Sequence, residues 1–167
     1  MSTVKTNNVQ VGQSATATNN FTLYQPSTPD GTVRLGVGNT GATTADVASF
    51  TSAGLFRFNS GYGSATTAYG CRAWVNFDGQ GTIAIRGSGN VSSITDNGVG
   101  DYTVNFTTAL VDANYNVVGI GGKDASYRNM LFESNLTARS ASLVRIESWA
   151  TAGGVYDQPY NSISIFR

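Results

Sequence analysis

The sequence predicts an all-β protein, and three observations support this fold class. Apolar and polar residues alternate at a period of two, as in Tyr102, Val104 and Phe106 of the segment VGDYTVNF. Turn-forming residues, among them 20 glycines, separate such segments throughout the chain. No stretch has a convincing helical period of 3.6 residues, although TTALVDANY could hold one short turn.

Residues 1–54 contain small apolar groups separated by long polar segments. Phe21 and Leu23 form one such group, and Pro29-Asp30-Gly31 predicts a tight turn. Segments this short and polar bury too little surface within one chain to offset an ordering entropy of roughly 1–2 kcal/mol per residue. Two alternatives remain, disorder or packing against other chains, and the regular apolar spacing favours packing. We therefore expect residues 1–54 to form an extended segment that becomes ordered on a partner.

From residue 55 onward, predicted strands follow one another closely. They occupy 55–59, 71–77, 81–87, 90–96, 99–106, 115–122, 130–135, 141–150 and 162–166. The segments at 99–106 and 115–122 alternate most clearly, and the polar link between them predicts a hairpin. The sequence DGQG at 78–81 predicts another hairpin turn, since glycine supplies positive φ. This spacing predicts that residues 55–167 form an antiparallel β-sandwich.

Charge and hydropathy exclude several classes of partner. Ten basic and ten acidic residues give a net charge of zero, so we expect no binding to nucleic acid. No segment approaches eighteen consecutive apolar residues, and we expect no membrane insertion. The first residues, MSTVKTNNVQVGQ, lack the apolar run of a secretory signal. We therefore expect synthesis in a cytoplasm without a signal peptide.

The residues that usually carry catalysis are scarce. The chain has no histidine, the commonest general base and metal ligand. Cys71 is the single cysteine, so we expect a small core residue rather than a nucleophile. Acidic residues such as Asp96, Asp101 and Asp112 are spread singly and suit turns, although a carboxylate pair assembled in space stays open. We expect no catalytic residue, cofactor or metal, and a protein that is not an enzyme.

Aromatic side chains are the remaining candidates for ligand contact. Tyr62, Tyr127, Tyr156 and Tyr160 lie in turn-like stretches, where an exposed ring could stack on a sugar. Packing in a core or an interface is the alternative for each of them. Trp74 is out of phase with the apolar residues beside it, so we expect it to face a subunit contact.

Two segments resemble a known family. The first, CRAWVNFDGQGTIAIRGSGNVSSITDNGVGDYTVNFTTALVDANYNVVG (71–119), resembles the C-terminal domain of fibre and tail proteins in bacteriophage virions, notably phages of cyanobacteria and other marine bacteria. The signature comprises Ala73 to Phe77 with Gly79, Gly89 to Asp96, Gly100, Tyr102 to Phe106, Asn114, Tyr115 and Val117. Gly87 stands where alanine is common. The second, NNFTLYQPSTPDGTVRLGVGNTG (19–41), is similar to the N-terminal segment of such proteins but consists of commoner residues.

The resemblance implies a homotrimeric component of the virion. Residues 1–54 would be its attachment and trimerisation segment, contacting other virion proteins, and residues 55–167 its β-sandwich knob. The implied function is that of a fibre or tail-tip protein whose knob contacts host-surface polysaccharide. Two alternatives stay open: capsid decoration or a baseplate adaptor without receptor contact, and a polysaccharide depolymerase, which would need a carboxylate pair in a groove.

Overall fold

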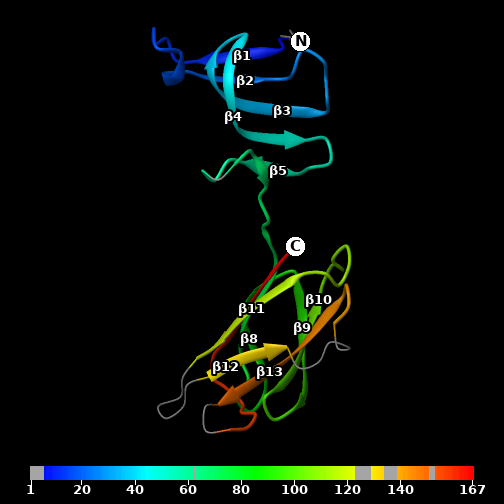
Figure 1. Ribbon diagram of the computed structural model, residues 1–167. Helices are drawn as coiled ribbons and strands as arrows, with labels where there is room; N and C mark the ends of the chain where they lie inside the picture. Colours follow the sequence, from blue (N-terminus) through cyan, green and yellow to red (C-terminus); the bar gives the residue numbers. More distant parts are fainter. Residues whose placement is uncertain (1–5, 62, 123–128, 134–138, 151–152) are drawn as a thin grey trace. The chain divides into compact units, whose positions relative to one another are not determined.

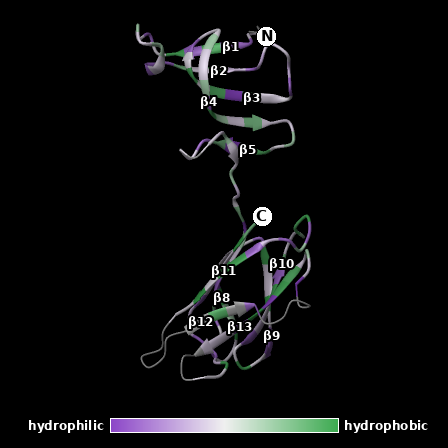
Figure 2. Cartoon of the chain, viewed as in Figure 1, coloured by the Kyte–Doolittle hydropathy of each residue, from purple (hydrophilic) through white to green (hydrophobic). Residues whose placement is uncertain are grey.

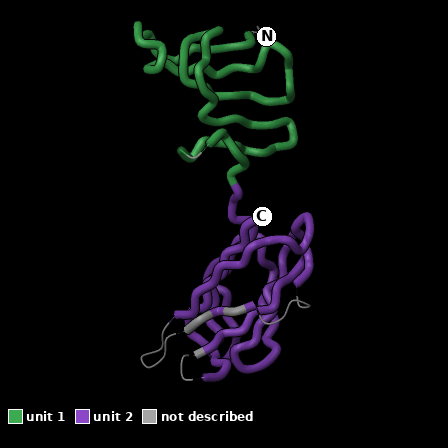
Figure 3. The backbone as a smooth tube through the Cα atoms, in the orientation of Figure 1, with its two compact units in different colours: residues 1–68 green, residues 69–167 purple. Residues whose placement is uncertain are grey.

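The computed structural model describes residues 6–61, 63–122, 129–133, 139–150 and 153–167 (Figure 1). The chain divides into two compact units, Met1–Ala68 and Tyr69–Arg167 (Figure 3). All sheets in the described ranges are antiparallel, and the helical content there is a single 3₁₀ turn, η1 (Ala17–Asn19). The predicted all-β class is therefore confirmed. In these same ranges no helix has the length and apolarity to cross a bilayer.

The first unit contains one six-stranded sheet in which each strand pairs with the next along the chain. Its strands are β1 (Asn8–Val11), β2 (Phe21–Tyr24), β3 (Thr32–Asn39), β4 (Ala42–Thr51), β5 (Phe56–Phe58) and β6 (Thr66–Thr67). The predicted turn before β3 is present, with Gly31 at φ +77° and Asp30 accepting the backbone N–H of Thr32 at 3.0 Å. In Figure 2, hydrophobic and hydrophilic residues both occur along these strands.

The division between the units lies later than the expected boundary after residue 54. Strand β5 pairs with β4 through Phe50↔Phe56 and Ala48↔Phe58, and β6 pairs with β5. The segment 55–59 therefore belongs to the first sheet rather than to the C-terminal unit. Local alternation identifies this strand, but only its pairing partner assigns it to a unit.

The second unit contains two four-stranded sheets. Sheet B has the order β11-β14-β7-β8, and sheet C has the order β12-β13-β10-β9. The strands are β7 (Cys71–Asp78), β8 (Ala84–Gly89), β9 (Val91–Gly98), β10 (Asp101–Phe106), β11 (Asn116–Gly121), β12 (Asn129–Glu133), β13 (Leu143–Ala150) and β14 (Asn161–Phe166). Strands β7 and β8 form the hairpin predicted around DGQG.

The hairpin predicted from 99–106 and 115–122 is wrong. Strand β10 pairs with β9 and β13, whereas β11 pairs with β14 in the other sheet. The link between them is buried in part, because Leu110 is 8% exposed and its N–H donates to the carbonyl of Ala141 at 2.8 Å. This link places the Leu110 side chain in the core and connects the two sheets instead of reversing within one.

Asn90 marks another crossing between the sheets, from β8 to β9. It is the one non-glycine residue with positive φ, +56°, in the part of the chain that the structure describes. Its side-chain amide donates to the carbonyls of Arg72 and Thr108 at 3.1 and 3.0 Å, and its Oδ1 accepts the N–H of Thr108 at 2.8 Å. These bonds hold the left-handed conformation that asparagine tolerates.

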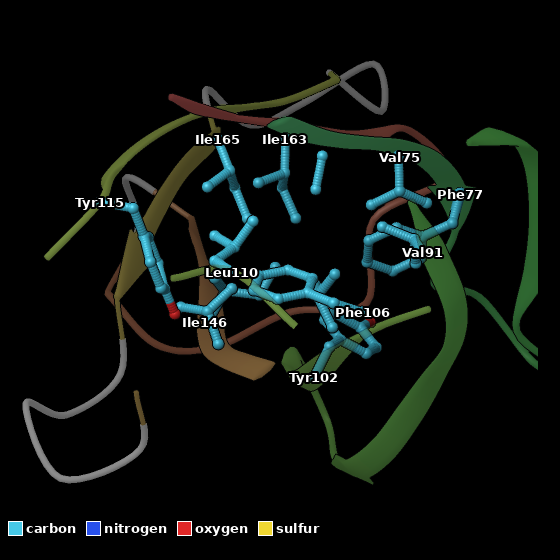
Figure 4. Close-up of a cluster of buried hydrophobic side chains, with 13 residues drawn as sticks. Val75, Phe77, Val91, Tyr102, Phe106, Leu110, Tyr115, Ile146, Ile163 and Ile165 are labelled. Atoms are coloured by element: carbon cyan, nitrogen blue, oxygen red, sulfur yellow. The ribbon is translucent and has the colours of Figure 1, made fainter. Parts of the chain in front are cut away.

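The buried hydrophobic cluster takes all its members from residues 73–165, and the labelled side chains in Figure 4 show how it is built. Sheet B contributes alternate residues of β7 and β14, paired as Val75↔Ile163, and sheet C contributes residues of β10 and β13, paired as Val104↔Val144. The rings of Phe77 and Tyr102, from different sheets, meet edge to face with centroids 5.1 Å apart. The complete cluster is Ala73, Val75, Phe77, Val91, Tyr102, Val104, Phe106, Leu110, Tyr115, Val144, Ile146, Ile163 and Ile165.

Cys71 lies outside this cluster. We expected a core residue, but its side chain is exposed at the start of β7. Its Sγ lies 3.2 Å from the carbonyl oxygen of Ala73. Cys71 shares the strand phase of Ala73 and Val75, but it is the first residue of β7 and lies beyond the register shift between Ile165 and Phe166, outside the buried cluster.

A polar contact closes one end of the core. The hydroxyl of the fully buried Tyr102 donates to Asp157 Oδ1 at 2.7 Å, and the same oxygen accepts the N–H of Gly100 at 2.7 Å. Gly79 permits this approach, because a Cβ there would lie 2.3 Å from the Tyr102 hydroxyl. Burial, and then the hydrogen bond with Asp157, raises the pKa of Tyr102 well above its usual value.

Replacing Tyr102 with phenylalanine tests the contribution of this contact. Tyr102→Phe leaves Asp157 Oδ1 without its hydroxyl donor, so we expect the free energy of unfolding of the second unit to fall by about 1–3 kcal/mol. Urea unfolding followed by tryptophan fluorescence reports on this unit, which holds both tryptophans of the chain. Tyr69→Phe, at a tyrosine that is 71% exposed, is the control. Equal effects in the two variants would contradict the prediction.

Alkaline pH should destabilise the second unit. Burial raises the pKa of Tyr115 to about 12, and its hydroxyl donates to the carbonyl of Leu143 at 2.8 Å. A raised folded-state pKa gives stability that is complete below the unfolded value of about 10 and is lost as the pH approaches the folded value. We expect the urea midpoint to fall between about pH 9 and about pH 11, and to fall less in Tyr115→Phe. An identical fall in this variant and the wild type argues against the prediction.

Candidate assembly surface

One face of the first sheet is built from apolar residues, because residues paired directly across strands lie on the same face. The register creates three rows across the sheet. They are Val9, Leu23, Leu35, Ala48 and Phe58; Val11, Phe21 and Val37; and Val33, Phe50 and Phe56. We call these eleven residues the apolar face. The rows run across five neighbouring strands, so the face is continuous.

Most side chains of the apolar face are open to solvent. Eight are between 41% and 64% exposed: Val9, Val11, Phe21, Leu23, Val33, Phe50, Phe56 and Phe58. The rings of Phe50 and Phe56 lie 5.1 Å apart between centroids, and those of Phe56 and Phe58 lie 6.1 Å apart. Side chains of these sizes and exposures present roughly 700 Å² of apolar surface, above the largest patch of a typical soluble monomer.

The opposite face of the same sheet is polar. Tyr24, Arg34, Ser49 and Arg57 follow one another across β2, β3, β4 and β5. Arg34 Nη1 donates to Asp46 Oδ2 at 2.9 Å, and the Tyr24 hydroxyl donates to the other oxygen of that carboxylate at 2.5 Å. This side contains a shallow hollow of about 440 Å³ with a largely polar and charged lining. Only the apolar face therefore calls for a covering layer.

That covering layer is not supplied within the first unit. Its described residues form a single sheet, and the hydrophobic cluster of the chain lies between residues 73 and 165. Sheets B and C of the second unit, by contrast, share that cluster. The first sheet thus has the composition of one layer of a two-layer structure.

The structure describes two of the four tyrosines predicted as ligand contacts. Tyr156 and Tyr160 lie between β13 and β14 and are 48% and 53% exposed. The Arg86 guanidinium lies over the Tyr160 ring, with Cζ 4.3 Å from its centroid. Tyr62 and Tyr127 lie outside the described residues.

Trp74 is also accessible, being 45% exposed on β7, whereas Ala73 and Val75 beside it are buried. Its phase in the sequence agrees with this exposure, and the subunit contact expected there stays a prediction. The apolar face, in contrast, was missed as a surface. Its signal in the sequence was the repeated pairs of apolar residues at spacing two, but the register that aligns those pairs is a long-range property.

The acidic side chains that the structure describes are largely engaged with arginine. Six ion pairs occur in these ranges: Asp30 and Asp46 with Arg34, Asp78 with Arg86, Glu133 with Arg139, Asp101 with Arg145, and Asp112 with Arg167. The hydrogen bond from Arg145 holds the pKa of Asp101 below its usual value, and that from Arg167 does the same for Asp112. The described residues contain no group of three or more His, Cys, Asp or Glu side chains that could hold a metal ion.

Comparison with models of known protein families, with curated protein sequences and with solved structures found no significant match. The candidate surface is therefore defined by its own geometry: a continuous, uncharged and exposed apolar sheet face in a unit without a second layer.

Proposed function

We propose that this chain is a non-enzymatic structural protein of a bacteriophage virion, a homotrimeric component of a fibre or tail tip. The observation that supports assembly is the apolar face, which has no covering layer in its own unit. The phage assignment rests on the sequence resemblance of residues 71–119 and 19–41. In this proposal the first unit joins the subunits and docks on the particle, and the second is an outward β-sandwich knob.

Assembly through the apolar face is favourable in area and in charge. A standard protein interface buries about 800 Å² on each partner, close to the roughly 700 Å² that this face presents. The rows contain no charged residue, so like charges do not meet when equivalent faces approach. Three copies around an axis would give each sheet the apolar second layer that it lacks.

The ion pairs of Asp101 and Asp112, two carboxylates singled out from the sequence, favour a structural protein over a depolymerase. Glycoside hydrolysis requires one carboxylic acid with a raised pKa to protonate the leaving group. Asp101 and Asp112 have lowered pKa values because arginine side chains donate hydrogen bonds to them. Such groups remain ionised and suit ion pairing, not acid catalysis.

In the proposed virion protein, the knob contacts a host-surface glycan. A single shallow contact of this kind is weak, and a trimer displayed in several copies multiplies it through effective concentration. In this proposal, trimerisation through the first unit therefore determines the overall affinity that the weak sites on the second unit reach together.

A charge placed on the apolar face should dissociate the assembly. We expect the wild-type chain to have a native mass three times that of its 17.5 kDa subunit. Phe50→Asp and Val11→Asp would each bring like charges together in the interface, at a cost of several kcal/mol, and should yield monomers. Native mass spectrometry measures the outcome, with circular dichroism as a check that the strands are retained.

Gln10→Asp is the matched control, because Gln10 precedes Val11 in β1 and pairs with Thr22 on the polar side. It should leave the trimer intact. A monomeric wild type at micromolar concentration, or an unchanged mass in both apolar-face variants, would disprove the assembly proposal.

A further inference from the structure

The outer face of sheet B carries an indole ring laid along a neighbouring strand. Trp74 leaves β7 on the side opposite the core, and its ring extends over β8 at the sheet edge. A Cβ on Gly89 would lie 2.4 Å from Trp74 Nε1, and one on Gly87 would lie 3.3 Å from Cη2. These two glycines therefore leave the space in which the indole rests, and the side chain remains 45% exposed.

Hydroxyl and amide groups lie next to this ring on the same face. Ser164 is the partner of Trp74 across the strands, and Ser162 is the partner of Asn76. Asn76 Nδ2 donates to Ser162 Oγ at 2.6 Å, so the pair is held in a fixed orientation. The alternation of β7 and β14 places these small polar groups on the outside, opposite Val75 and the rest of the core.

A second ring lies further along the same face. Gly122 N–H donates to the Tyr160 carbonyl at 2.5 Å, which continues the pairing of β11 with β14 and places Tyr160 in phase with Ser162 and Ser164. Four residues separate Tyr160 from Ser164, which corresponds to roughly 13 Å along the strand. The strand positions that carry the Trp74 and Tyr160 rings are therefore farther apart along the sheet than the length of one monosaccharide.

We propose that this outer face is a binding platform for a neutral polysaccharide chain, with Trp74 and Tyr160 as its two stacking rings. The inference rests on the proposed glycan contact of the knob and specifies its site and ligand class. Aromatic faces pack against the apolar faces of pyranose rings, and hydroxyl and amide groups between them bind sugar hydroxyls. A chain, rather than a single sugar, is needed to reach both rings.

The charges on this face favour a neutral ligand. Arg86 Nη2 donates to Asp78 Oδ2 at 2.7 Å, so its charge is already balanced beside Tyr160. In the strand register, the next pair on this face after Trp74 and Ser164 is the uncharged pair Asn76 and Ser162. An acidic polysaccharide would find no unpaired cation among these residues, whereas a neutral one meets matched donors and acceptors.

Affinity electrophoresis of the full chain tests the platform. Native gels would contain hydroxyethylcellulose, galactomannan or dextran as neutral probes and polygalacturonate as the acidic comparison. We expect at least one neutral polymer to retard the wild type more than polygalacturonate does. Trp74→Ala and Tyr160→Ala should each weaken that retardation about threefold to tenfold, the range expected for loss of one aromatic contact.

Two further variants separate the platform from a general effect of aromatic residues. Trp149→Ala removes an indole that is 39% exposed on β13 of the other sheet, and should bind as the wild type does. Gly89→Ala keeps Trp74 but places a methyl group where the indole lies, so it should weaken binding as Trp74→Ala does. Weakening by Trp149→Ala equal to that by Trp74→Ala would overturn the platform.

The remaining outcomes distinguish this inference from the proposed function. A wild type that no neutral polymer retards overturns the platform, whatever its native mass. A fall in native mass on Trp74→Ala would also overturn it, because the face would then be the subunit contact expected from the sequence. Retardation of a monomeric wild type, lost in Trp74→Ala, would support the platform while contradicting the trimer.

Discussion

A β-sheet with an apolar face must have that face covered, and the two units of this chain meet the requirement differently. In the second unit, sheets B and C share one core, where Phe77 from one sheet meets Tyr102 from the other. The described residues of the first unit form a single sheet, whose apolar face includes the 60%-exposed Phe50. Because removing apolar surface from water is the main favourable contribution to folding, the missing layer is the reason that we propose assembly through the first unit.

The sequence predicted the strands of the second unit better than their pairing. Alternation at Tyr102, Val104 and Phe106 depends only on neighbouring residues, and these positions are buried as their period requires. Pairing depends on contacts far apart in the chain, so the polar link after β10 was mistaken for a hairpin turn. The burial of Leu110 in that link is the clearest departure from the local pattern, since its neighbours Ala109 and Val111 are also apolar and the three together give no period of two.

The sequence identified the segment that carries most of the apolar face, but not the alignment of its apolar residues across the strands. The apolar pairs in residues 1–54 indicated a segment too poor in core residues to stand alone, but their alignment depends on the β-strand register. The ligand candidates show a related limit. Gly87 ends the predicted strand 81–87 and Gly89 follows it, and neither position indicates by itself that in β8 the missing side chains make room for Trp74. A residue that acts by leaving space is hard to recognise from sequence alone.

The proposed platform depends on the proposed assembly for its overall affinity, whereas the assembly does not depend on the platform. A platform on an open sheet face contacts its ligand from one side only, which leaves much of a sugar chain hydrated and limits the affinity of each site. Linking several such sites makes later binding events intramolecular, and the gain requires no additional contact at any of them. In this proposal, the apolar face of the first unit increases glycan binding by the second unit although no residue of that face touches the ligand. The platform, in turn, needs only to be flat, neutral and rigid, and Trp74 resting on two glycines beside the Asn76–Ser162 pair meets those requirements.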